Sequence, residues 1–504
     1  GFAGYSLFQN LIVGGQTVQG RDATNDLSFM CITASEHVFL PMPSLSIRVW
    51  HGSSKALLMR AAELTRTGIG LPAYYNDEVI IPALVHRGAT MDEARNYNII
   101  GCVEPQVPGK TDGWHDAAFF NMCRPLEMVF SNGYDNGEIA SIQTGNVESF
   151  QSFDEFMEAY RKQMLYNIEL MVNADNAIDY AHAKLAPLPF ESCLVDDCIK
   201  RGMSAQEGGA IYNFTGPQGF GIANVADSLY TIKKLVFEEK RITMGELKKA
   251  LEMNYGKGLD ATTAGDIAMQ VAKGLKDAGQ EVGPDVIANT IRQVLEMELP
   301  EDVRKRYEEI HEMILELPKY GNDIDELARE AAYFYTRPLE TFKNPRGGMY
   351  QAGLYPVSAN VPLGAQTGAT PDGRLAHTPV ADGVGPTSGF DISGPTASCN
   401  SVAKLDHAIA SNGTLFNMKM HPTAMAGEKG LESFISLIRG YFDQQGMHMQ
   451  FNVVDRATLL DAQAHPEKYS GLIVRVAGYS ALFTTLSKSL QDDIIKRTEQ
   501  ADNR

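Results

Sequence analysis

Two short segments, far apart in the chain, carry residues suited to hydrogen-atom transfer. Gly478 lies within RVAGYS at 475–480, and Cys102 lies within GCVEP at 101–105. Glycine is the one residue whose Cα–H can be removed to leave an unhindered planar radical, because no side chain obstructs planarity. The adjoining amide nitrogen and carbonyl both stabilise that radical. Since a thiol S–H bond is similar in strength, a radical stored on Gly478 could pass to Cys102, and the thiyl could take hydrogen from a substrate.

Glu104 follows Cys102 by two residues, a spacing that in an extended segment directs both side chains to the same side of the backbone. A thiyl that removes hydrogen from a carbon bearing a hydroxyl makes that hydroxyl far more acidic. A carboxylate beside the sulfur could then accept the hydroxyl proton while an adjacent leaving group departs. Taken singly, a buried cysteine and a glycine at a strand end are usually structural.

Five longer motifs, one of which contains Cys102, make a structural interpretation of Cys102 and Gly478 less specific than a functional one. They are GCVEPQ at 101–106, YNFTGPQG at 212–219, LYPVSANVPLG at 354–364, TGATPDGR at 367–374 and FNVVDRATLLDAQ at 451–463. On these motifs the chain resembles the glycyl radical enzymes, which are pyruvate formate-lyase-like, and among them the B12-independent glycerol and propane-1,2-diol dehydratases. The resemblance implies an α/β fold, a ten-stranded barrel of two antiparallel half-barrels surrounded by helices, with Cys102 and Gly478 on finger loops. Residues 1–370 would be the C-terminal part of the barrel domain, and residues 371–504 the glycine radical domain.

The resemblance also implies a set of substrate-binding residues. Asp116, preceded by His115, matches an aspartate that binds substrate hydroxyls in the diol dehydratases. A carboxylate suits that role because it can accept hydrogen bonds from two vicinal hydroxyls. Tyr355 and Phe8 match pocket-lining positions, although aromatic residues at such places are by default core packing. Choline-cleaving members tend to carry Thr and Tyr at the positions of His115 and Phe119, so this sequence favours a diol.

The implied reaction is anaerobic elimination of water from propane-1,2-diol or glycerol to give an aldehyde, started by a thiyl on Cys102. Gly478 would receive its radical after translation from a radical S-adenosylmethionine activase, and neither cobalamin nor a metal in this chain is expected. We expect a homodimer in the cytoplasm, either free or inside a bacterial microcompartment. Choline trimethylamine-lyase and isethionate sulfite-lyase, which use the same machinery, remain the alternative.

Functions from other classes fit less well. A thiol hydrolase with Cys102 as nucleophile and His115 as base leaves the RVAGYS segment unexplained. A non-catalytic scaffold is not supported, because the Cys-Val-Glu motif at 102–104 and the glycine motif around Gly478 are both intact. Because Val103 follows Cys102, the adjacent cysteine pair of the pyruvate-cleaving branch is absent, which argues against acyl transfer.

Composition narrows the partners and the compartment. The 504 residues carry 44 basic and 62 acidic side chains, a net charge of −18, which argues against nucleic acid and acidic membrane surfaces as partners. No apolar stretch reaches the ~20 residues of a membrane span. Six irregularly spaced cysteines favour a reducing compartment over a disulfide framework. The chain begins at Gly1 within sequence that already looks folded, so we expect a large N-terminal portion with further pocket residues to precede it, and a complete C-terminus.

Hydrophobic periodicity predicts the elements that must position these residues. Residues 22–97 indicate mixed α/β organisation with a helix at Ser54–Arg66, and helical periodicity runs from 150 to 183. Residues 228–342 are charged and amphipathic and predict several surface helices in an outer layer. The strands expected nearest to the chemistry are 98–100 before Cys102, 412–420, 447–454, and 472–476 before a turn at Gly478.

Overall fold

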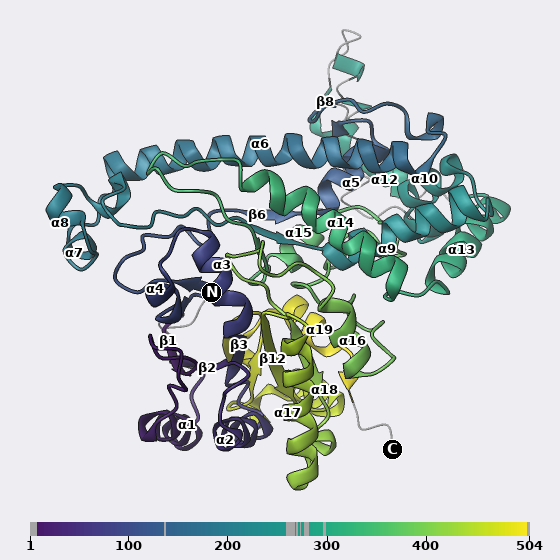
Figure 1. The fold of residues 1–504 in the computed structure, drawn as a ribbon. Helices are drawn as coiled ribbons and strands as arrows, with labels where there is room; N and C mark the ends of the chain where they lie inside the picture. The colour runs from purple at the N-terminus through teal and green to yellow at the C-terminus, as the bar shows by residue number, and fades with distance from the viewer. Residues whose placement is uncertain are drawn as a thin grey trace.

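The structure, a computed structural model, describes residues 8–135, 138–258, 268, 271–272, 274–276, 282–295 and 299–500. The fold is mixed α/β: in Figure 1 the long helix α6 (Phe153–Leu185) crosses the top of the molecule, and strands β1, β2, β3 and β12 lie below it. In the described part of the chain, no helix is both long enough and apolar enough to cross a membrane.

The central sheet has six strands in the order β1-β2-β3-β12-β11-β15. The strands are β1 (Asn10–Gly14), β2 (Ser44–Val49), β3 (Ala73–Asn76), β12 (His448–Val453), β11 (Asn417–Met420) and β15 (Glu499–Gln500). Each set of three is parallel, and the two sets meet in one antiparallel pair in which His448 lies opposite Tyr75. Strands β2, β3 and β12 are buried along their whole length, as expected where both faces are covered. Among the described residues the sheet is open, so the predicted closed barrel of ten strands is not seen.

Helices make the crossovers that parallel strands require. Helix α1 (Asp26–Val38) joins β1 to β2, α2 (Lys55–Arg66) joins β2 to β3, and α17 (Gly427–Asp443) joins β11 to β12. The predicted helix at α2 is confirmed: it begins after Ser54, whose side chain accepts the Ala56 N–H. Helix α3 (Asp77–His86) follows β3 directly.

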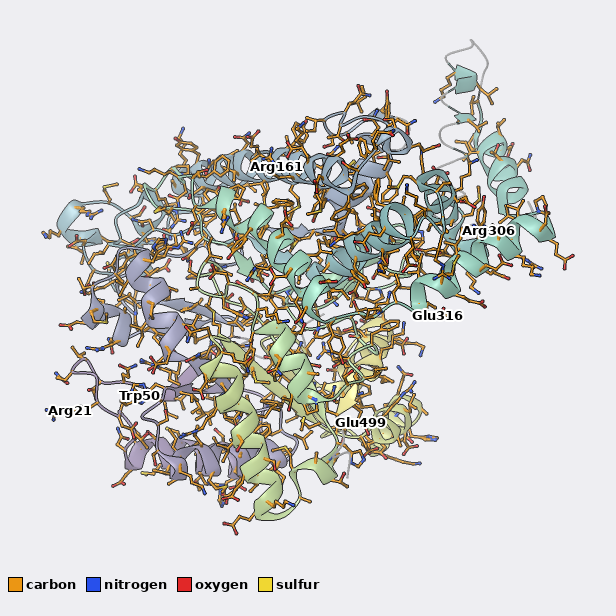
Figure 2. All side chains as sticks on the ribbon, turned by 45° about the vertical axis from the view of Figure 1, so that its right-hand side comes forward. Arg21, Trp50, Arg161, Arg306, Glu316 and Glu499 are labelled. Carbon is orange, nitrogen blue, oxygen red and sulfur yellow. The ribbon has the colours of Figure 1, made fainter. Side chains whose placement is uncertain are left out.

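The helical layer is built on α6, whose prediction from periodicity is also confirmed. Ser152 caps its start, and Pro187 follows its end. Helix α14 (Asn322–Leu339) packs against both α6 and α9 (Ile222–Thr231), while α10 (Met244–Glu252), α12 (Pro284–Leu295) and α13 (Glu301–Leu315) extend the layer. Figure 2 shows Arg306 of α13 at the outer edge, well away from Trp50, which follows β2. The outer layer was predicted, but α14 is more than a surface helix, because Tyr335 and Leu339 are buried.

Two hairpins carry the predicted chemical residues. Strands β4 (Asn98–Ile100) and β5 (Glu104–Gln106) pair antiparallel, with Ile100 opposite Glu104, and Cys102 lies in the turn between them. Strands β13 (Ile473–Arg475) and β14 (Ser480–Leu482) form the second hairpin, with Gly478 at its tip. The segment from Cys102 to Glu104 is therefore a tight turn entering a strand, and the extended segment predicted there is wrong.

Nearby, β6 (Phe119–Asn121), β9 (Gln218–Phe220) and β10 (Gly353–Leu354) form a small parallel sheet. The remaining elements are α4 (Met91–Arg95), α5 (Cys123–Phe130), β7 (Tyr134–Asp135), β8 (Glu138–Ile139), α7 (Pro189–Ser192), α8 (Cys198–Arg201), α15 (Asn360–Gly364), α16 (Pro395–Val402), α18 (Arg456–Ala464) and α19 (Lys488–Lys496).

Candidate active site

The tips of the two hairpins meet inside the protein. Gly478 has φ of +85°, a left-handed backbone conformation that favours glycine. A Cβ placed on Gly478 would lie 2.0 Å from the Cβ of Cys102 and 2.6 Å from its Sγ. Cys102 is 1% exposed. The Gly478 backbone is therefore in direct contact with a buried thiol side chain, and no side chain fits between them.

The glycine hairpin is held by its neighbours on strand β12. The Val476 N–H donates to the Tyr479 carbonyl at 2.8 Å, which closes the tip. Asn452 of β12 binds both backbone groups of Arg475: its Oδ1 accepts the N–H and its Nδ2 donates to the carbonyl, each at 2.7 Å. In this two-stranded hairpin, these side-chain bonds satisfy the backbone N–H and carbonyl of Arg475.

The Cys102 thiol is kept protonated by its surroundings. Burial raises its pKa well above the usual range, and the nearby carboxylates of Glu104 and Asp116 raise it further, against a weaker opposing effect of Arg475. The Tyr75 hydroxyl donates to the Cys102 carbonyl at 2.8 Å and fixes the turn. A thiol nucleophile needs a lowered pKa, whereas a hydrogen-atom donor needs an intact S–H bond. The site therefore suits hydrogen-atom transfer and not thiolate attack.

Glu104 lies beside this thiol and is 1% exposed. Its Oε2 accepts the N–H of Val103. Burial raises the pKa of Glu104 to about 8, and the charge of Asp116 adds to the rise, while hydrogen bonds from Val103 and Tyr355 oppose it. A carboxyl with a pKa in this range can both accept and release a proton near neutral pH, which suits a general base.

His115 is buried, with a ring nitrogen against Asn412. Burial lowers its pKa to about 4, against a weaker opposing hydrogen bond from Asn412, so the ring is neutral. Its Nδ1 lies 2.6 Å from Asn412 Oδ1, which can only accept, so the proton is on Nδ1. The Tyr355 hydroxyl, which also contacts Glu104, lies 3.0 Å from the His115 carbonyl. In the described part of the chain, the ring nitrogens of His115 lie against Asn412 and Gln106 and not against Cys102, which a hydrolase base would have to contact.

Asp116 and Phe8 lie at the edge of this cluster. Asp116 is exposed to solvent at the surface of the described chain, yet desolvation by the surrounding protein raises its pKa to about 6. Its charge reaches both Cys102 and Glu104. The Phe8 ring packs edge-on against Tyr479, with 5.9 Å between ring centroids. All seven residues singled out from the sequence therefore lie around the contact between the two hairpin tips.

Two models of known protein families match the sequence of this chain. Residues 1–364 match the family model described as pyruvate formate lyase-like, and residues 380–484 match the model described as glycine radical. The chain belongs to the glycyl radical enzymes.

Individual members of this family are similar over nearly the whole chain. The (2S)-3-sulfopropanediol dehydratase of Klebsiella oxytoca is 37% identical over 508 residues, covering 99% of this chain and 55% of that protein. A solved structure described as 1,2-propanediol dehydration in Roseburia inulinivorans is 99% identical with a TM-score of 0.97, covering 99% of this chain and 60% of that one. The glycerol-bound B12-independent glycerol dehydratase of Clostridium butyricum is 53% identical with a TM-score of 0.88, covering 99% and 57%. The chain therefore spans a little over half the length of these relatives.

Asn412 is a polar residue beside the two hairpin tips that sequence reasoning missed. Asn412, completely buried, joins three segments: besides His115 Nδ1, its amide lies 3.0 Å from the Tyr355 hydroxyl and 3.1 Å from the Gly216 carbonyl. The next residue, Gly413, packs so closely that a Cβ there would lie 2.5 Å from the Val103 carbonyl. Asn412 lay inside a predicted strand, and strand β11 in fact begins five residues later. An Asn-Gly pair at the start of an apolar run was the available signal for a loop.

Proposed function

We propose that this chain is the radical-carrying part of a dehydratase that eliminates water from a vicinal diol, propane-1,2-diol or glycerol, and releases an aldehyde. The observation that carries the proposal is the direct contact between the Gly478 backbone and the protonated Cys102 thiol, with two carboxylates beside it. A vicinal diol as substrate is supported by the similarity to structures described as 1,2-propanediol dehydration and as a glycerol dehydratase. A radical S-adenosylmethionine activase would supply the radical on Gly478.

In the proposed mechanism, the residues at the two hairpin tips take the following roles. The Gly478 radical takes the hydrogen atom of the Cys102 S–H, and the resulting thiyl takes a hydrogen atom from C1 of the diol. Glu104 accepts the C1 hydroxyl proton as the C2–O bond breaks and passes this proton to the departing hydroxide, so water leaves without net proton uptake and Glu104 is ionised again. The product radical then recovers a hydrogen atom from Cys102. Burial of this pair keeps water and dioxygen away from the radicals.

A first prediction concerns Glu104 as the base. Only its ionised form can accept the C1 proton, and its raised pKa keeps it protonated over a wider range, so kcat/KM should rise with pH up to about 8. Glu104→Gln should flatten this rise and slow turnover by at least ~10²-fold. Anaerobic rate measurements between pH 6 and 9 test both expectations, with the glycyl spin signal of the variant as the control for activation. Turnover near the wild-type rate would mean that another group accepts the proton.

A second prediction concerns Asp116 and the substrate. Asp116→Asn should lower kcat/KM for propane-1,2-diol and glycerol roughly ten- to hundred-fold, the loss of about 1.5–3 kcal/mol for a hydrogen bond to a charged group. Because the variant also removes a negative neighbour of Glu104, the midpoint of the pH profile should move to lower pH. A shift to higher pH would contradict the placement of Asp116 beside Glu104.

The substrate assay that tests the proposed function compares propanal or 3-hydroxypropanal formation with trimethylamine or sulfite release. Wild-type protein should act on the diols and leave choline and isethionate untouched. A trimethylammonium group has no N–H or O–H that could donate a hydrogen bond to the Asp116 carboxylate. Amine or sulfite as the dominant product would favour the alternative lyase and leave the radical mechanism standing.

For the whole protein we propose a ten-stranded barrel, with residues 1–370 in the barrel domain and residues 371–504 in the glycine radical domain. The antiparallel pairing of β3 with β12, where two parallel sets of three strands meet, supports two antiparallel half-barrels. The extents of the two family matches support the domain division. A cytoplasmic or microcompartment homodimer that uses neither cobalamin nor a metal remains part of the proposal.

A further inference from the structure

Gln450, on strand β12, is a completely buried side chain directed at the backbone of Gly478. Its Oε1 accepts the Gly478 N–H at 3.1 Å and the Arg475 Nε–H at 2.9 Å. Its Nε2 donates to Oδ1 of Asn417, the residue opposite it on β11. Reversing the amide would turn Nε2 toward two N–H donors, so the network fixes the orientation with the oxygen toward glycine.

The same network holds the peptide that precedes the tip. Asn417 Nδ2 donates to the Val476 carbonyl at 3.2 Å and also binds Asp382. Arg497 Nη1 donates to the same carbonyl at 2.9 Å, and its Nη2 lies 3.1 Å from the Asp382 carboxylate. The Val476 carbonyl and the N–H of Gly478 are thus both fixed by side-chain hydrogen bonds, although among the described residues strand β13 pairs only with β14.

A hydrogen bond at the Gly478 N–H bears on the radical as well as on the fold. The glycyl radical is stabilised when the amide nitrogen shares its lone pair with the half-filled orbital on Cα, which requires the peptide groups on both sides to be coplanar with that centre. An acceptor on the N–H increases electron density at nitrogen and resists rotation of the peptide out of that plane. In a buried site, loss of the acceptor also leaves an unsatisfied N–H.

We infer that Gln450 is a positioning residue for the radical: its carbonyl holds the Gly478 amide in the orientation that both delocalises the unpaired electron and presents Cα to Cys102. This rests on the proposed function, because it assumes that Gly478 carries the radical. Arg475 strengthens the arrangement by holding the Gln450 oxygen in place. Arg475 is itself buried, and burial lowers its pKa, with partial compensation from Tyr75 and Cys102.

The test uses Gln450→Met in the full-length protein, a change that keeps the length of the side chain and removes the acceptor. Gln163→Met is the matched control, since Gln163 is equally buried and hydrogen-bonded but lies on α6, where it binds Ser141 and the Ile142 carbonyl. In unactivated protein, hydrogen exchange at Gly478 should become at least ten-fold faster in Gln450→Met and stay unchanged in Gln163→Met. After anaerobic activation, Gln450→Met should hold several-fold fewer glycyl spins, and they should decay faster.

A third measurement needs no variant. Wild-type protein labelled with ¹³C at the glutamine side-chain carbonyl should show a weak ¹³C coupling on the glycyl signal in electron–nuclear double resonance. Unchanged exchange and unchanged spin yield in Gln450→Met, or equal losses in both variants, would overturn the inference, as would absence of the ¹³C coupling. Wild-type protein that gives no glycyl signal under activation would instead contradict the proposed function, and the exchange experiment would still decide whether Gln450 holds the Gly478 amide.

Discussion

Admitting air to the activated protein is expected to cut the backbone at Gly478 and release a C-terminal piece that begins near Tyr479. Dioxygen adds to a carbon-centred backbone radical, and the peroxyl product breaks down with cleavage of the chain at that residue. Mass spectrometry of the two fragments locates the break. Unactivated protein given the same exposure is the control and should stay whole.

This experiment is a cleaner test of the radical position than replacement of the glycine. At φ of +85°, with a Cβ directed into Cys102, alanine at 478 would strain the hairpin, so loss of the radical would have two causes. Fragmentation requires no substitution. An activated, air-exposed chain that is still intact at Gly478 would contradict the radical assignment.

Cys102→Ala is expected to abolish turnover to below detection while the glycyl spin signal remains. Gly478 can still store the unpaired electron, but no S–H bond is left to carry hydrogen to and from the substrate. The spin signal and anaerobic aldehyde formation should be measured on the same sample. Cys123→Ala is the matched control, because Cys123 is another completely buried cysteine, at the start of α5 with its sulfur 3.7 Å from the Gly221 carbonyl. The control should turn over; detectable product from Cys102→Ala would remove its thiol from the mechanism.

The parts of the fold that the sequence predicts well are those governed by local patterns. Helices α2 and α6 follow from a capping serine and a 3.6-residue period, and β12 lies almost where its apolar run predicts. Pairing between distant strands has no local signal. Tyr75 and His448 face each other across β3 and β12, yet nothing near either residue in the chain indicates this partner. The order of the strands in the sheet therefore had to come from the structure.

The candidate site divides in the same way. Resemblance to a family placed Cys102 and Gly478 together, and the structure puts them in contact, while the roles of the surrounding residues stay predictions. Asn412 and Gln450 were missed because their hydrogen-bond partners come from distant parts of the chain and cannot be read from the local sequence. Strand β12 alternates apolar and polar residues, a pattern that predicts a polar face open to solvent, but the structure buries both faces, so Gln450 looked like an ordinary exposed strand position. Only the partners of its amide distinguish Gln450 from an ordinary strand residue.

The contact at the hairpin tips also has a stereochemical consequence. Glycine is achiral, but inside a fold its two Cα hydrogens occupy different places. The position that a Cβ would take on Gly478, which for an L residue corresponds to the pro-S hydrogen, points at Cys102, 2.6 Å from Sγ. In the proposed mechanism the thiol therefore exchanges only this hydrogen with Cα, while the pro-R hydrogen faces away and stays on the residue. The fold makes a symmetric residue behave as a chiral one, and each turnover should return hydrogen to the face from which it was taken.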